Sequence, residues 1–138
     1  MATQRPRPLP DLDSAGFWQA AAKDQLALQQ CQSCSAYMFP PVGICRECGG
    51  ELEYAPLSGK GEIYSFIVQH HQITGGFEDD LPYVIAVVTP VEAPQIRIPT
   101  RIVGVPPEAV QCGQQVEVRF EHPEGEDFGV PVFTPVNA

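Results

Sequence analysis

Cys31-Gln-Ser-Cys34, followed ten residues later by Cys45-Arg-Glu-Cys48, decides how the first part of this 138-residue chain folds. Each pair holds two cysteines at the offset that lets one tight turn point both sulfur atoms at the same ion. Zinc at structural sites prefers a closed tetrahedron of four thiolates, with no coordination position left for water or substrate. The two pairs therefore predict one structural zinc ion held by Cys31, Cys34, Cys45 and Cys48.

Two other uses of these cysteines are open. Disulfide bonds suit the chain less well than a metal, because its count of five cysteines is odd and four of them have the paired spacing of metal ligands. Iron bound by the same four thiolates would make a rubredoxin-type electron carrier, and the spacing alone does not separate iron from zinc. The fifth cysteine, Cys112, has no partner nearby in the sequence and is expected to be a small buried apolar side chain.

A flexible tail, a short helix and three short strands are expected around the cysteines. Residues 1–13 contain several prolines and no periodic pattern, which predicts the tail. The helix is predicted over 14–24, with Phe17 and Trp18 on one face. The strands, of which the first two form a hairpin, are expected just before Cys31, over 37–39 and over 52–57.

A repeated strand pattern follows the turn Ser58-Gly59-Lys60-Gly61, which divides the chain into a helix and ribbon in 14–60 and a second domain in 61–138. One helical turn is expected over 106–110, between the third and fourth strands of this domain. Five short strands with a helical turn at this place are typical of the OB-fold, a Greek-key barrel, although a sandwich also fits. The predicted strands cover 63–71, 83–89, 96–102, 115–120 and 130–134.

Acidic residues dominate the second half of the chain. The formal net charge is -9, and residues 1–60 hold five basic and six acidic side chains, whereas the residues after Gly61 hold three basic and eleven acidic ones. Because nucleic-acid affinity rests on Lys and Arg that displace counterions, this balance disfavours a nucleic-acid partner. No apolar run approaches the ~20 residues of a membrane-spanning helix, and the N-terminus lacks the pattern of a secretory signal, so a cytoplasmic protein is expected.

The sequence contains no convincing catalytic set. His70 and His71 are adjacent on a predicted strand, so their side chains should point to opposite faces, and His122 stands near an acidic loop. Arg97 and Arg101 share a predicted strand face about 13 Å apart at ordinary strand rise. Surface ion pairs explain these arginines as well as contact with a nucleotide does. We therefore expect a chain that is not catalytic by itself.

A series of short motifs gives the chain a resemblance to one family. The motifs are Phe17-Trp18, Leu26-Ala-Leu-Gln-Gln-Cys31, Phe39-Pro40-Pro41, Cys45-Arg-Glu-Cys48-Gly49, Ser58-Gly59-Lys60-Gly61, Leu81-Pro82-Tyr83, Arg101-Ile-Val-Gly104 and Gly113-Gln-Gln-Val116. In this order, between residues 14 and 122, they resemble the zinc-ribbon plus OB-fold proteins catalogued as domain of unknown function thirty-five, which are acyl-CoA-associated. Asp24-Gln25 and Ser35 depart from the family pattern, which usually has a Gly-Lys pair and a glycine at these places.

The resemblance implies a mainly β chain with an N-terminal helix, a rubredoxin-like zinc ribbon and a C-terminal five-stranded OB-fold barrel. It also implies a role as the small partner, in a hetero-oligomer, of a thiolase-fold enzyme that acts on acyl-CoA thioesters. Such an enzyme is a thiolase, an acyltransferase or a side-chain aldolase, and it would supply most of the contacts to the CoA ester. The alternatives are a hotdog-fold hydratase as the partner, an independent acyl-CoA-binding protein and a single-strand nucleic-acid module.

Six residues are expected to contact a partner or substrate: Tyr37, Phe39, Pro40, Pro41, Arg97 and Arg101. The aromatic and proline residues would form an apolar docking surface, because aromatic side chains dominate interface energetics. Phe17 and Trp18 are apolar as well, but packing of the helix onto the ribbon accounts for them at least as well as an interface does.

Overall fold

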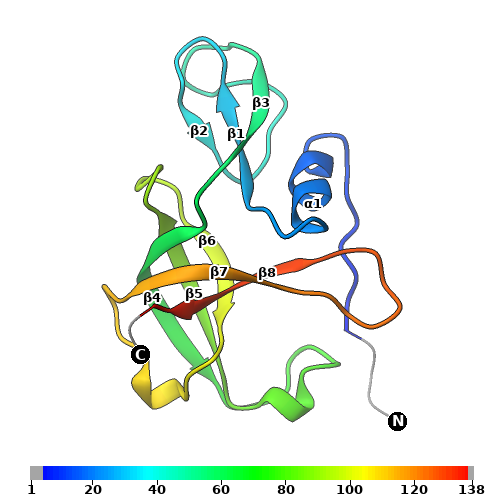
Figure 1. The fold of residues 1–138 in the computed structure, drawn as a ribbon, viewed down its shortest axis with the longest axis vertical. Helices are drawn as coiled ribbons and strands as arrows, with labels where there is room; N and C mark the ends of the chain where they lie inside the picture. Colours follow the sequence, from blue (N-terminus) through cyan, green and yellow to red (C-terminus); the bar gives the residue numbers. More distant parts are fainter. Residues whose placement is uncertain (1–4, 137–138) are drawn as a thin grey trace.

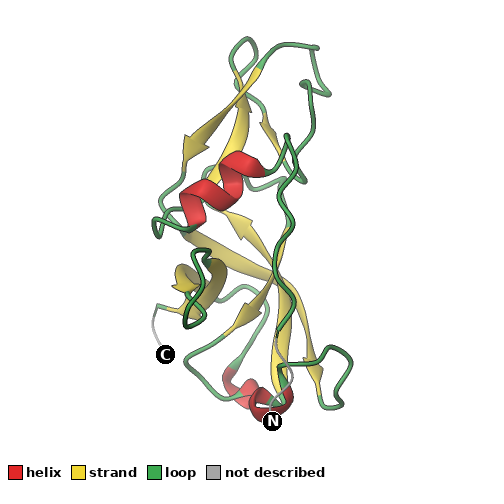
Figure 2. Cartoon of the chain, turned by 90° about the vertical axis from the view of Figure 1, so that its right-hand side faces the viewer, coloured by secondary structure: helices red, strands yellow, loops and turns green. Residues whose placement is uncertain are grey.

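Residues 5–136 form an elongated molecule in the computed structural model, with a small ribbon at one end and a barrel at the other (Figure 1). The helix α1 (Ala15–Ala21) lies between them, and the chain before it runs along the barrel (Figure 2). Residues 1–4 of the predicted tail, together with 137–138, lie outside the described part of the chain. Residues 5–13 contain no helix or strand, and the flexibility of the tail stays a prediction.

Three strands build the ribbon, namely β1 (Ala27–Cys31), β2 (Tyr37–Met38) and β3 (Leu52–Pro56). β1 lies in the middle and is antiparallel to both neighbours, so the hairpin predicted through the first cysteine pair is confirmed. The ribbon's own buried cluster contains only Cys31, Met38 and Cys45. A core of this size is too small to hold a fold without a cross-link or a metal.

Five strands close into a barrel in the order β4-β5-β6-β8-β7. Every neighbouring pair is antiparallel except β6 and β8, which run parallel. This is the Greek-key closure of an OB-fold, so the five predicted strands are confirmed, and a sandwich is ruled out because the sheet closes on itself. The strands are β4 (Lys60–Gln69), β5 (Tyr83–Pro90), β6 (Ile98–Ile102), β7 (Gln115–Glu121) and β8 (Val130–Pro135).

Apolar side chains that alternate along the strands fill the barrel. In β5, Val84, Ala86 and Val88 are buried, while the residues between them are partly exposed on the outer face. Two short 3₁₀ turns, η1 (Glu78–Asp80) and η2 (Pro107–Ala109), join strands of the barrel. η2 lies between β6 and β7, which confirms the helical turn predicted over 106–110.

α1 fits between the ribbon and the barrel because a glycine stands at each contact. A Cβ on Gly16 would lie 2.2 Å from the ring of Tyr54 in β3, and a Cβ on Gly129 would lie 2.5 Å from the backbone oxygen of Ala21. The helix is shorter than the predicted 14–24, and Asp24 follows it with a left-handed φ of 61°. Within residues 5–136 no helix has the length and apolar character needed to cross a membrane.

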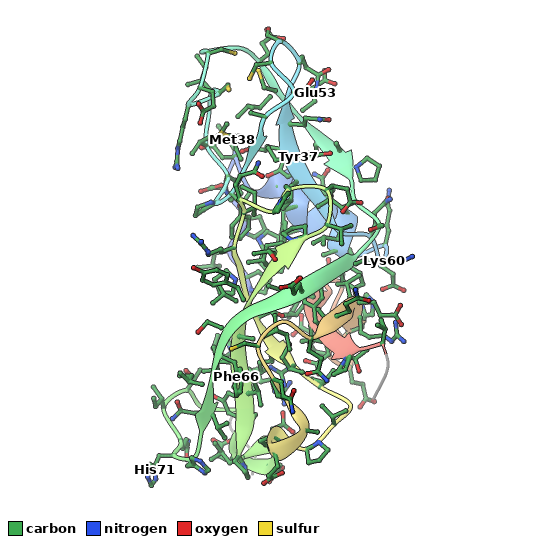
Figure 3. The ribbon with its side chains drawn as sticks, turned by 90° about the vertical axis from the view of Figure 1, so that its left-hand side faces the viewer. Tyr37, Met38, Glu53, Lys60, Phe66 and His71 are labelled. Atoms are coloured by element: carbon green, nitrogen blue, oxygen red, sulfur yellow. The ribbon has the colours of Figure 1, made fainter. Side chains whose placement is uncertain are left out.

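Two details predicted from the sequence are wrong. β4 ends at Gln69, so His70 and His71 follow the strand instead of occupying its opposite faces, and Figure 3 shows His71 at the end of the barrel farthest from the ribbon. Cys112 is exposed, because it lies in the turn after η2, where Gly113 with a φ of 86° reverses the chain at the surface.

Gly129→Ala should destabilise the protein by about 1–3 kcal/mol, the usual cost of overpacking a close contact. The new methyl group would meet a backbone carbonyl of α1, which cannot rotate away as a side chain would. Urea unfolding measures the loss. Gly43→Ala is the control, because its Cβ would have only Asp13 Oδ1 nearby, at 3.8 Å. Equal stabilities of the two variants would contradict the packing assigned to Gly129.

Candidate metal centre and apolar groove

The four cysteines of the ribbon converge on one point. Their sulfur atoms all lie within 4.8 Å of one another, with the Sγ atoms of Cys31 and Cys48 3.4 Å apart and those of Cys34 and Cys45 3.6 Å apart. Figure 3 shows sulfur atoms at the end of the ribbon that points away from the barrel. Among residues 5–136, no other group of three or more Cys, His, Asp or Glu side chains is arranged to hold a metal ion.

The backbone of each cysteine pair points its N–H groups at sulfur. Ser33 and Cys34 direct theirs at the Sγ of Cys31, at 3.3 and 3.4 Å. Glu47 does the same toward the Sγ of Cys45, at 3.3 Å. These donors stabilise negative charge on sulfur, which is the state a metal ligand needs.

A residue with positive φ closes each cysteine turn. Gly49, with a φ of 77°, donates its N–H to the backbone oxygen of Cys45, and Ser35, with a φ of 66°, donates to that of Cys31, both at 3.0 Å. This conformation costs an ordinary residue about 1–2 kcal/mol. Ser35 and Asp24, the two departures from the family pattern, are the two described non-glycine residues with positive φ. Both residues therefore adopt the positive φ for which the family usually has glycine at these positions.

These thiols suit a cation. The backbone N–H groups of Cys34 and Ser33 lower the pKa of Cys31 to about 6, against the opposing effect of burial. Thiolates this close repel one another unless a positive charge lies between them. Four sulfur donors with no position left open fit a structural metal rather than a catalytic one. The structure thus brings together all four predicted ligands in an arrangement that can hold a structural metal ion.

An apolar groove of about 610 Å³ lies where the ribbon, α1 and the barrel meet. Its walls come from α1, from the loop after β2 and from β5, β6 and β8. Four of the six predicted contact residues line it: Phe39, Pro40, Pro41 and Arg101. The structure therefore gathers most of the predicted contact set at one place, and it brings Arg101 next to the distant Phe39-Pro40-Pro41 segment.

The other two predicted contact residues lie outside the groove. Tyr37 is partly buried and packs against the main core. The guanidinium of Arg97 stands over the ring of Tyr64, 4.1 Å from its centre. The prediction that Arg97 and Arg101 share one strand face is wrong in its geometry, because β6 begins at Ile98, after Arg97.

The aromatic residues of α1 divide between core and groove. Phe17 is buried and meets Trp18 edge to face with 5.1 Å between ring centres, and Phe39 at 6.3 Å. Trp18 is only partly buried and lines the groove. Packing within the chain thus accounts for Phe17, while Trp18 is available at the groove surface.

A buried glutamine that the sequence patterns do not single out holds the groove wall. Gln29 of β1 is 6% exposed, its Nε2 donates to the backbone oxygen of Val42 at 2.7 Å, and the N–H of Val42 donates to its Oε1 at 2.8 Å. This pair of bonds fixes the chain just after Pro41. The only signal in the sequence is a polar residue that follows Leu28 in an alternating strand pattern, which by itself predicts exposure.

The second unforeseen contact joins the corner after α1 to the barrel. The ring of His122 forms a hydrogen-bonded ion pair with the carboxylate of Asp24, 98 positions away in the sequence. This hydrogen bond raises the pKa of His122, and burial opposes it only in part. No local pattern connects two residues so far apart.

A four-cysteine ribbon followed by a closed five-stranded barrel defines a zinc-ribbon plus OB-fold protein. Residues 18–53 match the family of the ChsH2 rubredoxin-like zinc ribbon domain, and residues 54–121 match the ChsH2 C-terminal OB-fold domain. The chain belongs to this ChsH2/DUF35 family, which confirms the resemblance carried by its motifs.

Relatives of the chain are named as a scaffold protein and as subunits of enzymes. A DUF35 domain-containing scaffold protein of Methanothermobacter thermautotrophicus is 38% identical over 102 residues, which are 71% of this chain and 74% of the relative. A probable enoyl-CoA hydratase alpha subunit of Thermomonospora curvata is 34% identical over 132 residues, 95% of this chain, and the chain spans 40% of that relative's length. The benzoylsuccinyl-CoA thiolase subunit BbsA of Thauera aromatica is 28% identical over 106 residues, 76% of this chain and 69% of the relative.

A solved structure extends this comparison. A chain of the Ltp2-ChsH2(DUF35) aldolase superposes on this one with a TM-score of 0.84 at 32% sequence identity. The superposition covers 94% of this chain and 98% of that chain. The ribbon, the helix and the barrel are therefore shared along nearly the whole length.

Asp24→Asn should destabilise the protein near pH 6 and leave its stability nearly unchanged near pH 9. Because Asp24 raises the pKa of His122 above the usual 6.5, the pair stabilises the folded state fully below about pH 6.5 and loses this effect as the pH rises through the raised value. Asparagine keeps the tolerance for positive φ. Urea unfolding at both pH values tests this, with Asp79→Asn on η1 as the control. An equal loss at both pH values would rule out the ion pair as the cause.

Proposed function

We propose that the chain is a non-catalytic subunit of a complex with a thiolase-fold enzyme, either a thiolase, an acyltransferase or an aldolase acting on acyl-CoA thioesters. One observation carries the proposal: an apolar groove lies open at the junction of ribbon, helix and barrel. Apolar patches that stay open at the surface often mark sites of protein association. Among the relatives, one is named as a thiolase subunit and one as part of an aldolase, which supports this class of partner.

The docking face would consist of the groove and the adjoining outer face of the barrel. Ile85 of β5 lines the groove, and Ile67 of β4 lies opposite it in the sheet and is 59% exposed. Phe39, Pro40 and Pro41 continue the same apolar surface onto the ribbon. The partner would therefore contact both domains, proposed as residues 14–60 and 61–138, and would hold their relative orientation.

The partner would also supply the chemistry and most of the contacts to the CoA ester. None of the three histidines is among the residues that line the groove, and His122 is engaged by Asp24. Arg101 is the one cation of the groove lining, and it forms ion pairs with Glu121 and, at 3.6 Å, with Asp80. Phosphate recognition requires cations that are not already neutralised.

We further propose that zinc is the metal held by Cys31, Cys34, Cys45 and Cys48. In this position its role is structural, because the four thiolates come together only in the folded ribbon, so the free energy of metal binding adds to the free energy of folding. The small buried cluster of the ribbon supports this assignment, since it offers little apolar burial to replace a lost metal. Iron at the same site remains the alternative, and it differs from zinc by visible absorbance.

Elemental analysis of the native protein should find about one zinc per chain, with no visible absorbance. Cys48→Ser should reduce the zinc content to well below one ion and unfold the ribbon, because it removes one of four ligands. Cys112→Ser should change neither, since this exposed cysteine lies in the barrel domain far along the chain from the ribbon. Full folding and full metal content of Cys48→Ser would contradict the assigned ligand set.

Ile67→Asp should weaken binding of the partner enzyme at least about tenfold, the effect of a charge placed in an apolar interface. Val91→Asp is the matched control, because Val91 is also 59% exposed, whereas only Ile67 is paired in the sheet with Ile85 of the groove lining. Affinity purification from the source, followed by identification of the co-purifying chain, supplies the partner for a calorimetric titration. Equal affinities of the two variants would show that the partner docks elsewhere.

The same purification separates the proposed function from its alternatives. A co-purifying hotdog-fold hydratase would replace the thiolase-fold enzyme as the partner, and the relatedness to a probable enoyl-CoA hydratase alpha subunit gives this candidate its support. Tight binding of CoA esters by the isolated chain, measured by calorimetry, would instead establish an independent acyl-CoA-binding protein. The absence of both kinds of enzyme from the purified sample would remove the support for a scaffold role.

A further inference from the structure

The segment Arg5-Pro6-Arg7-Pro8, called the strap below, lies against the barrel and forms one wall of a second cavity of about 610 Å³. Trp18, Phe77, Arg101 and Val130 line this second cavity and the apolar groove alike, so the two spaces adjoin. Figure 2 shows the chain before α1 running across the barrel. The strap therefore stands at one end of the groove.

Arg5 occupies a site made of a ring, a carbonyl and two carboxylates. Its guanidinium lies 4.2 Å from the centre of the Phe77 ring, and its Nε donates to the backbone oxygen of Gly76 at 2.8 Å. It also forms ion pairs with Asp80 and, at 3.5 Å, with Glu121. Stacking and charge pairing at one guanidinium are the combination that distinguishes arginine from lysine.

The loop beneath the strap is shaped to the strap's backbone as well as to its side chains. Gly76 has a φ of 95°, and a Cβ there would lie 2.7 Å from the backbone nitrogen of Arg5. The carboxylate of Glu78 accepts the N–H of Gly76 at 2.9 and 3.1 Å and fixes this turn. Only glycine allows the two chain segments to approach so closely.

Arg7 repeats the arrangement at a second ring. Its guanidinium lies 5.7 Å from the centre of the Phe128 ring and pairs with Glu126 at 3.0 Å. Pro6 and Pro8 restrict both arginines to extended backbone, which lowers the entropy lost when the segment binds. Two arginines, two residues apart, thus each meet an aromatic ring and a carboxylate.

We propose that the barrel carries a recognition site for an extended Arg-Pro-Arg segment, formed by Phe77, Phe128, Asp80, Glu121 and Glu126. The chain's own strap occupies this site, and the occupied site closes one end of the groove. The charges fit this occupant. Three carboxylates of the barrel lie at the site with only one guanidinium of the barrel, that of Arg101, so two further positive charges balance them. The inference does not depend on the identity of the partner enzyme.

The strap is suited to reversible closure. Arg101 pairs with Asp80 and Glu121 by itself and stacks 5.1 Å from the centre of the Phe77 ring, so the site stays formed when the strap leaves. Partly exposed ion pairs are individually weak and are screened by salt. Anything that binds the open groove therefore competes with the strap, and the closed fraction lowers its apparent affinity.

The test uses Nile red, a neutral apolar dye, as the probe of the groove. Arg5→Ala/Arg7→Ala should bind the dye about three- to tenfold more tightly than the native chain, because the closed fraction disappears. Trp18 is the single tryptophan and lines both cavities, so its quenching by acrylamide should also increase in this variant. Rising salt should increase dye affinity in the native chain and leave the variant nearly unchanged.

Lys60→Ala/Arg119→Ala is the matched control, because it also removes two positive charges, one from β4 and one from β7. It should behave as the native chain does. Arg5→Lys/Arg7→Lys keeps the charge without the planar group, so its dye affinity should lie between that of the native chain and that of Arg5→Ala/Arg7→Ala. Equal dye affinity and equal Trp18 quenching in the strap variant and the control would overturn the proposal. Dye affinity of the native chain that changes with protein concentration would assign the strap to a second copy and would overturn closure within one chain.

Discussion

The convergence of four thiol groups is the constraint on which the rest of the structure depends. All four sulfur atoms lie within 4.8 Å of one another, and two of the three residues in the ribbon's own buried cluster are cysteines of this group. Apart from the metal-site residues, the ribbon's own buried cluster therefore contains only Met38. The loop that carries Phe39 to Pro41 is tied to the same sheet by Gln29 and Val42, so one wall of the groove depends on the thiol cluster as well.

The helix α1 turns two small domains into one surface. Gly16 lets it approach the ribbon at Tyr54, and Gly129 lets it approach the barrel at its last turn. Phe17 belongs to the same buried cluster as residues of β1 and of the barrel strands, so the core is continuous from ribbon to barrel. The groove is a property of this junction, because neither the ribbon nor the barrel supplies all of its walls.

Local patterns were sufficient to predict the cysteine cluster, the hairpin and the five strands, because each has a spacing or a period in the sequence. They left both an OB-fold and a sandwich open, and the resemblance to the family implied the OB-fold. Contacts between distant residues have no such signature. Asp24 and His122 are 98 positions apart, and Arg5 and Gly76 are 71 apart. The positive φ of Asp24 and Ser35 was visible only indirectly, as two departures from positions where the family usually has glycine. Cys112 was misplaced since its neighbours form a turn rather than a strand.

The charges of the barrel argue for a division of tasks between this chain and a partner. Its three arginines are each engaged: Arg97 with the ring of Tyr64, Arg101 with Glu121 and Asp80, and Arg119 with Glu117. With eleven acidic side chains after Gly61, the phosphates of a CoA ester would meet an unfavourable potential here. Binding to an apolar groove, by contrast, is favoured by any molecule that covers it with apolar surface, because this removes apolar area from water. In the proposed complex, recognition of the partner protein would therefore be the task of this chain, and recognition of the CoA phosphates would be the task of the partner enzyme.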